Sequence, residues 1–154
     1  MHLVHFSAEP LTTIKSTPFN PDVKGFRRWK PQGLWVSVEE PTNPDWLGWS
    51  NWCRSENFRL ERLAHATRIF LKQDSRVLII PQDMDINTFS NTFRKTDIPF
   101  RDEIYSIDWE RVQQTYQAII ISPYDWTARH DLMWYYPWDC ASGCIWDATA
   151  IKPV

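Results

Sequence analysis

The sequence has 154 residues, which suits one domain rather than two, and 43% of them are hydrophobic and 23% charged, as in an ordinary folded protein. The formal net charge of −2 argues against a broad electrostatic grip on nucleic acid or on an anionic membrane, although Lys24, Arg27, Arg28 and Lys30 form a small basic patch. No apolar run and no leader pattern stands out, so we expect neither a transmembrane helix nor a signal peptide.

The three cysteines, Cys53, Cys140 and Cys144, are an odd number, which indicates reduced thiols and a cytoplasmic location. These cysteines together with a histidine are one conceivable zinc site, but the spacing of Cys140 and Cys144 differs from the usual pair and no second cysteine pair exists. A cysteine nucleophile with a histidine base is another alternative, and no signature marks it. We therefore predict no metal site.

The first half of the chain predicts a strand at residues 3–7, a proline-rich loop over 11–32 and a second strand at 33–38. Asp45 is a possible cap for a helix that runs from about residue 47 to residue 66. The second half alternates apolar runs with helical patterns. Its expected elements are a strand at 76–81, helices at 85–95 and 108–116, a loop at 97–106, a strand at 118–122, an irregular segment at 124–139 and a last strand at 143–146. Short strands mixed with uneven helices predict a single α+β domain over residues 1–154.

Two strands carry side chains suited to ligand binding. His5 stands near the end of the first strand, where an imidazole can donate a hydrogen bond to a ribose hydroxyl, although a lone strand histidine is more often structural. In the second strand Gly33 allows a ligand or another backbone to come close, and alternation places Trp35 and Ser37 on one face. An aromatic ring beside a hydroxyl suits a nicotinamide ring and its amide, while an ordinary core tryptophan is the alternative.

The ten tryptophans are far more than usual, and they either fill a small core or wall a rigid cleft. Trp46, Trp49 and Trp52 are spaced by three residues, which would make them neighbours on a helix and walls of the same cleft. Asp139 lies between aromatic residues just before the last strand. A carboxylate there is a candidate for stabilising the positive ion that forms when the bond between nicotinamide and ribose breaks, or it is a simple turn residue.

The order of these motifs resembles the ADP-ribosyltransferase superfamily. His5 and Ser7 resemble its first motif, and the stretch Gly-Leu-Trp-Val-Ser at residues 33–37 is similar to the Gly-Ile-Tyr-Phe-Ala stretch of poly(ADP-ribose) polymerase-like members. Trp49 or Trp52 resembles the aromatic residue that stacks on nicotinamide, with Trp46 as an alternative. Asp139 stands for the acidic third motif, usually Glu, unless the strand start is displaced toward Ser142. The opening residues also resemble phage-encoded members that act on the infected host.

The resemblance implies a split mixed β-sheet core with flanking helices, and mono-ADP-ribosyl transfer from NAD, as co-substrate, to a protein or nucleic-acid acceptor, by a bacterial or phage effector in the cytoplasm. Under it, Asp139 and His5 would be catalytic, and the nucleotide would be bound by His5, Ser7, Trp35, Ser37, Trp49 and Trp52. No Glu-x-Glu or Gln-x-Glu pair is present, which puts arginine as acceptor in doubt. A non-catalytic module of the same fold that binds a nucleotide or a protein, and an NAD glycohydrolase, are the alternatives.

Overall fold

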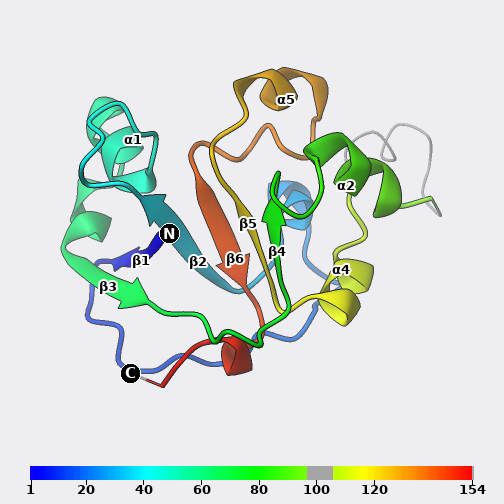
Figure 1. The fold of residues 1–154 in the computed structure, drawn as a ribbon, viewed down its shortest axis with the longest axis horizontal. Coiled ribbons are helices and arrows are strands. Elements are labelled where there is room, and N and C mark those ends of the chain that lie inside the picture. Colours follow the sequence, from blue (N-terminus) through cyan, green and yellow to red (C-terminus); the bar gives the residue numbers. More distant parts are fainter. Residues whose placement is uncertain (97–105, 154) are drawn as a thin grey trace.

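The computed structural model describes residues 1–96 and 106–153, and in these residues it contains one six-stranded mixed sheet (Figure 1). The strands stand in the order β3-β1-β2-β6-β5-β4. Their bounds are His2–Ser7 for β1, Leu34–Glu39 for β2, His65–Ile69 for β3, Val77–Ile80 for β4, Ala118–Ile121 for β5 and Ser142–Ile145 for β6. The α+β class and the single domain agree with the sequence prediction.

The pairing of β1 with β2 is shorter than either strand. β4 and β5 run parallel, and all other neighbours are antiparallel. Backbone pairing between β1 and β2 ends at Val4 opposite Ser37, whereas β2 continues to Leu34 against β6. The edge of β2 that faces β1 is therefore without a strand partner at Trp35, and this opening positions the site described below.

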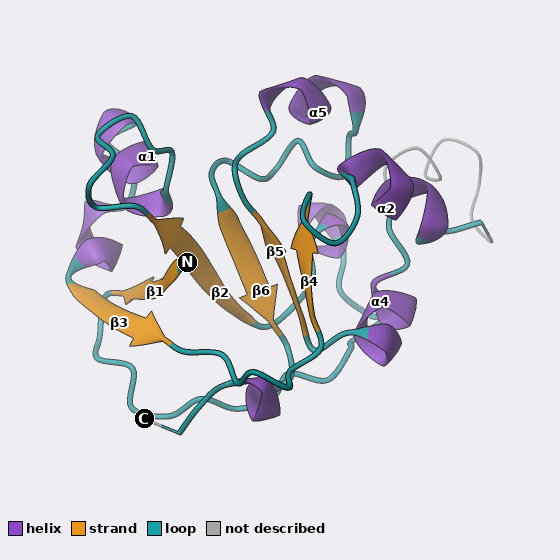
Figure 2. Ribbon diagram, in the orientation of Figure 1, coloured by secondary structure: helices purple, strands orange, loops and turns teal. Residues whose placement is uncertain are grey.

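Short helices and 3-10 turns connect the strands (Figure 2). The α-helices are α1 at Trp49–Ser55, α2 at Ile86–Thr92, α4 at Trp109–Thr115 and α5 at Trp126–Asp131, and the 3-10 turns are η1 at Gly25–Trp29, η2 at Leu60–Leu63 and η3 at Ala148–Ala150. Asp85, Asp108 and Asp125 cap α2, α4 and α5 by accepting hydrogen bonds from backbone N–H groups of the first turn. Within the described residues, no helix has both the length and the apolar character that crossing a bilayer requires.

The two faces of the sheet are covered differently. On one face β4, β5 and β6 pack against α2, α4 and the aromatic segment after α5, where Phe89, Trp134 and Trp138 are fully buried. On the other face Leu3, Val36 and the remaining inward residues pack under the loop around residues 11–14 and the C-terminal segment. Trp35 is half-buried and packs against the first of these cores at its margin, which leaves part of the ring for a cavity.

The expected helix over residues 47–66 is wrong in its length. α1 ends at Ser55, and the chain then turns through Asn57 and Arg59, whose φ angles of 49° and 44° are incompatible with a continuing helix. The residues that follow form the 3-10 turn η2 and then β3, which pairs with β1 along the edge of the sheet. The apolar residues of the expected helix fit helical spacing only loosely. The conformation at its end is decided by the pairing of residues 65–69 with β1.

Two smaller predictions also differ from the structure. Asp45 does not cap α1; the residue before the helix is Gly48, and the first turn is held instead by the carboxylate of Glu39. The segment at 124–139 is not wholly irregular, because Asp125 caps α5 within it. The remaining expected strands and the helices at 85–95 and 108–116 are present, with bounds that differ by no more than three residues at either end. The loop expected at 97–106 lies outside the described residues apart from Ser106.

Candidate functional site

A cavity of about 440 Å³ opens where β1 and β2 separate, and its size lies within the range of small-ligand sites. Five of the predicted site residues line this cavity: His5, Trp35, Ser37, Trp49 and Asp139. Ser7 and Trp52 are outside its lining. The hydroxyl of Ser7 donates to the carbonyl oxygen of Glu9 at 2.6 Å. Motifs far apart in the chain therefore meet at one place.

His5 is held by the backbone of β2. Its Nδ1 lies 2.8 Å from the carbonyl oxygen of Trp35, which is the group that β1 leaves without a strand partner. Because a carbonyl oxygen only accepts, Nδ1 carries a proton in this contact. In the tautomer with its single proton on Nδ1, Nε2 is an acceptor and would accept from a ribose hydroxyl, whereas the sequence suggested that His5 would donate to one.

Ser37 organises the start of α1. Its side chain is 3% exposed, and its hydroxyl donates to Oε1 of Glu39 at 2.7 Å and accepts from the backbone N–H of Trp49 at 2.8 Å. Glu39 also accepts from the backbone and the hydroxyl of Ser50. One lone pair of the Ser37 oxygen is left for a ligand. The sequence alone did not identify Glu39 as a site residue, because its role depends on the contact between β2 and α1.

Aromatic rings form one wall of the cavity. Trp49 lines it directly, and Trp52 stacks behind Trp49 with ring centroids 5.1 Å apart and planes 15° from parallel. Phe58 packs edge-on against both rings and also lines the cavity. Trp46 does not take part, because it precedes α1 and its Nε1 donates to the carbonyl oxygen of Val38. The expected tryptophan wall is thus made by Trp49, with Trp52 as its support.

Lys30 reaches into the cavity from the loop before β2. Its Nζ lies 4.9 Å from the centroid of the Trp35 ring, a cation–π arrangement, and the Trp138 ring meets Trp35 nearly edge-on. Burial lowers the pKa of Lys30, and the negative charge of Asp139 partly opposes that shift. The sequence placed Lys30 in a basic patch but gave no signal that it enters the site.

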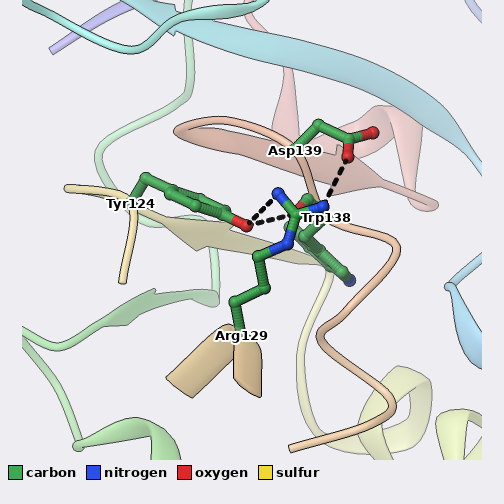
Figure 3. Close-up of polar contacts among 4 residues, drawn as sticks. All are labelled: Tyr124, Arg129, Trp138 and Asp139. Carbon is green, nitrogen blue, oxygen red and sulfur yellow. Dashed lines mark hydrogen bonds and ion pairs between the residues drawn. The ribbon is translucent and has the colours of Figure 1, made fainter. Parts of the chain in front are cut away.

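Asp139 is fixed by the segment that leads into β6 (Figure 3). Its Oδ1 lies 3.9 Å from the Arg129 guanidinium on α5, and its side chain is 25% exposed. Arg129 also donates to the hydroxyl of Tyr124, which in turn donates to the carbonyl oxygen of Trp138 at 2.6 Å. Burial raises the pKa of Asp139, although Lys30 and Arg129 favour its charged form.

The cavity carries more positive than negative side chains. Arg59 and Arg62, from the turn after α1 and from η2, line it together with Lys30, while Asp139 is its acidic residue. Arg59 adopts the left-handed backbone conformation and its guanidinium lies 5.2 Å from the Phe58 ring centroid. A non-glycine residue in this conformation carries strain, which is common near binding sites. The two arginines were missed because the segment was expected to be helical.

The three cysteines are buried and unpaired. Burial raises the pKa of Cys140 to about 12 and also raises the pKa values of Cys53 and Cys144. The Cys144 thiol lies against the carbonyl oxygen of Pro31, in the wall behind the cavity. No group of three or more histidine, cysteine or acidic side chains suited to a metal ion occurs among the residues that the structure describes.

Gly33 permits a close approach between two strands. A Cβ atom at Gly33 would collide with the carbonyl oxygen of Ile145 in β6. The close approach expected at this glycine is therefore made by another backbone, one of the two alternatives that the sequence left open.

Comparisons with known proteins gave no match to a family model, to a curated protein or to a solved structure. The resemblance to ADP-ribosyltransferases therefore rests on the motif residues, and the functional argument rests on the cavity.

Proposed function

We propose that the cavity binds NAD and that the protein transfers ADP-ribose from it to a macromolecular acceptor. The observation that carries this proposal is the convergence of His5, Trp35, Ser37, Trp49 and Asp139 on one cavity of small-ligand size. These are residues from four separate parts of the sequence, and each was singled out for a part of the same ligand.

The polar and aromatic groups suit the parts of a pyridine dinucleotide. Nε2 of His5 would accept from a ribose hydroxyl, and the tryptophan wall would stack on the nicotinamide ring. Arg59 and Arg62 would neutralise the diphosphate, since guanidinium groups bind phosphate oxygens in pairs. The net positive lining favours an anionic ligand over a neutral sugar or an apolar one.

In the proposed reaction the bond between the nicotinamide nitrogen and C1 of the ribose breaks, and nicotinamide leaves with the electron pair. The ribose becomes an oxocarbenium ion, which Asp139 would stabilise electrostatically. A nucleophilic atom of the acceptor then bonds to the same carbon and gives up its proton. Partial burial of the carboxylate strengthens this effect because the surroundings are less polar than water.

The decisive experiment uses NAD labelled separately in the nicotinamide and adenylate groups, incubated with the protein and a bacterial lysate. Release of nicotinamide together with label on a macromolecule supports transfer, and protease or nuclease digestion identifies the acceptor class. Asp139→Asn should abolish release while leaving NAD binding within about threefold, and Asp74→Asn, an exposed acid of a loop, should behave as wild type. Equal release by wild type and Asp139→Asn would remove Asp139 from the mechanism.

A second function, nucleotide binding without turnover, is favoured by one observation. Lys30 lies over Trp35, and its positive charge attracts the carboxylate of Asp139. This attraction partly neutralises the negative charge that would stabilise the oxocarbenium ion. Saturable NAD binding with no release of nicotinamide would establish this function. Free ADP-ribose without labelled macromolecules would instead identify a glycohydrolase. For each function we propose a cytoplasmic site of action, as in a bacterial or phage effector, supported by the three unpaired cysteines.

A further inference from the structure

We propose that a second cavity, next to the candidate site, binds a phosphate-bearing small molecule. This cavity has a volume of about 630 Å³ and lies between the loop around residues 19–32 and the start of α4. It shares Lys30 with the NAD cavity but none of the other site residues discussed above. The proposal does not depend on the function proposed for the first cavity.

Three lysines from two segments converge on this cavity. Lys24 precedes η1, Lys30 precedes β2 and Lys95 follows α2. Lys30 and Lys95 are half-buried, so their charges act where water screens them less than at an open surface. Asp108 and Glu110 also line the cavity, and the carboxylate of Asp108 is engaged in capping α4. The basic patch read from the sequence is thus part of a cavity wall.

The walls are held by hydrogen bonds within the described residues. The side-chain amide of Gln32 donates to the carbonyl oxygen of Asn20 at 3.2 Å, which closes the loop on itself. The backbone N–H of Lys95 donates to the carbonyl oxygen of Ser106, and the backbone N–H of Asp108 donates to that of Phe93. These contacts fix Lys95 beside the start of α4.

Two buried donors beside the lysines are without an acceptor in the described part of the chain. Trp109 is 4% exposed, and neither its indole N–H nor the side-chain amide nitrogen of Gln113 has a hydrogen-bond partner there. Both residues line the second cavity. Buried donors are normally satisfied, so each such group calls for an explanation. A phosphate group offers several acceptor oxygens and a negative charge, and it satisfies the donors and the lysines together.

The test follows the indole N–H of Trp109 by ¹H–¹⁵N correlation spectroscopy during titration with inorganic pyrophosphate. Trp109→Phe and Trp49→Phe assign the reporter signals of the second and first cavities. We expect a saturable shift of the Trp109 signal in wild type, and at least tenfold weaker binding in Lys24→Gln/Lys95→Gln. The matched double variant Lys15→Gln/Lys72→Gln removes the same charge elsewhere and should bind as wild type.

A parallel titration with ADP identifies the source of the phosphate. Tighter binding of ADP than of pyrophosphate supports a nucleotide ligand, and equal binding supports free phosphate. The proposal is overturned by no saturable shift, by a shift that sodium chloride of equal ionic strength reproduces, or by equal weakening in both double variants. If only the Trp49 signal moves, the second cavity is not a phosphate site while the first cavity still binds the anion.

Discussion

His5 and Trp35, which are 30 residues apart in the chain, are joined by a 2.8 Å contact between an imidazole nitrogen and a backbone carbonyl oxygen. The contact replaces the strand hydrogen bond that β1 would supply if it continued to pair with β2. It therefore fixes the edge of the opening and the orientation of the ring at once. Substitution of His5 can separate this structural contact of Nδ1 from the proposed ligand contact of Nε2.

His5→Asn should keep the contact with the carbonyl oxygen of Trp35 and lose the proposed ligand contact, because the Asn amide nitrogen stands where Nδ1 stands and nothing replaces Nε2. We expect stability within about 0.5 kcal/mol of wild type and NAD affinity at least tenfold lower. His5→Ala should lose the affinity and also about 1 kcal/mol of stability. Urea unfolding and calorimetric NAD titration measure the two effects. Equal destabilisation by both substitutions would show that the contact with Trp35 contributes nothing.

Ser37→Ala should destabilise the protein by about 2 kcal/mol, because it leaves the backbone N–H of Trp49 without its partner and removes one hydrogen bond from Glu39, which keeps those from Ser50. Ser7→Ala is the matched control; its hydroxyl lies in an exposed contact, and the change should cost less than about 0.5 kcal/mol. Urea midpoints at constant slope check both values. Similar midpoints for the two variants would contradict the structural role given to Ser37.

The features that the sequence predicted are those set by neighbouring residues. The apolar runs of β4 and β5 and the helical patterns at 85–95 and 108–116 need only local chemistry, and their elements stand close to where they were expected. β3 was missed because its conformation comes from pairing with β1, a contact between segments some sixty residues apart. Periodicity along one segment carries no information about such a partner.

The site was predictable to the same extent. His5, Trp35 and Asp139 could be chosen as residue types suited to one ligand; the strands of His5 and Trp35 are neighbours in the sheet, and Asp139 precedes β6, which pairs with β2. Lys30, Arg59 and Arg62 could not be chosen, because they enter the cavity from irregular segments whose direction depends on tertiary contacts. Ser7 and Trp52 satisfied the same motifs, yet the Ser7 hydroxyl donates to the carbonyl oxygen of Glu9 outside the cavity and Trp52 lies behind Trp49.

Asp139→Asn should make the folded protein more stable at neutral pH while removing the proposed transferase activity. Burial raises the pKa of Asp139 above its ordinary value of 3.8, so the folded state disfavours the charged carboxylate. As pH rises from about 3.8 through the raised pKa, the wild type therefore loses stability relative to the variant. Below pH 3.8 the carboxyl group is protonated in both the folded and unfolded states, so the stabilities of the two proteins should converge. Thermal unfolding from pH 3 to pH 7 measures the difference. A variant less stable than wild type at pH 7 would contradict the prediction.

Asp147→Asn should show the opposite pH dependence. Hydrogen bonds from Thr149 and Gln117 lower the pKa of Asp147, so the folded state favours its charged form. The stability this carboxylate contributes is present above its ordinary pKa of 3.8 and is lost as pH falls through the lowered pKa. The variant should therefore be less stable than wild type at pH 7, with a difference that shrinks in acid. The same thermal series, run beside Asp139→Asn, tests whether the two signs differ.

The three cysteines should resist alkylation in the folded protein. All are buried, and the raised pKa of each thiol leaves little thiolate at pH 8. Iodoacetamide at pH 8 should label them at least a hundredfold faster in denaturant than in native buffer, as followed by intact mass. Rapid native labelling of Cys140, which lines the first cavity, would show that the cavity opens more than the structure indicates.

Lys30 should discriminate between the oxidised and reduced forms of the nicotinamide ring. Its ammonium lies over Trp35, so a positively charged pyridinium ring entering this part of the cavity meets a like charge, whereas the neutral dihydropyridine ring does not. Both dinucleotides carry the same diphosphate, and its attraction to Lys30 cancels when their affinities are compared as a ratio. Lys30→Met should therefore shift that ratio toward NAD by about fivefold, equivalent to roughly 1 kcal/mol of repulsion between close charges in a water-like medium.

Lys152→Met, at the far C-terminal segment, is the matched control and should leave the ratio unchanged. An unchanged ratio in Lys30→Met would mean that the ring of the dinucleotide does not bind beside Trp35, because a positive charge at that distance must otherwise be felt.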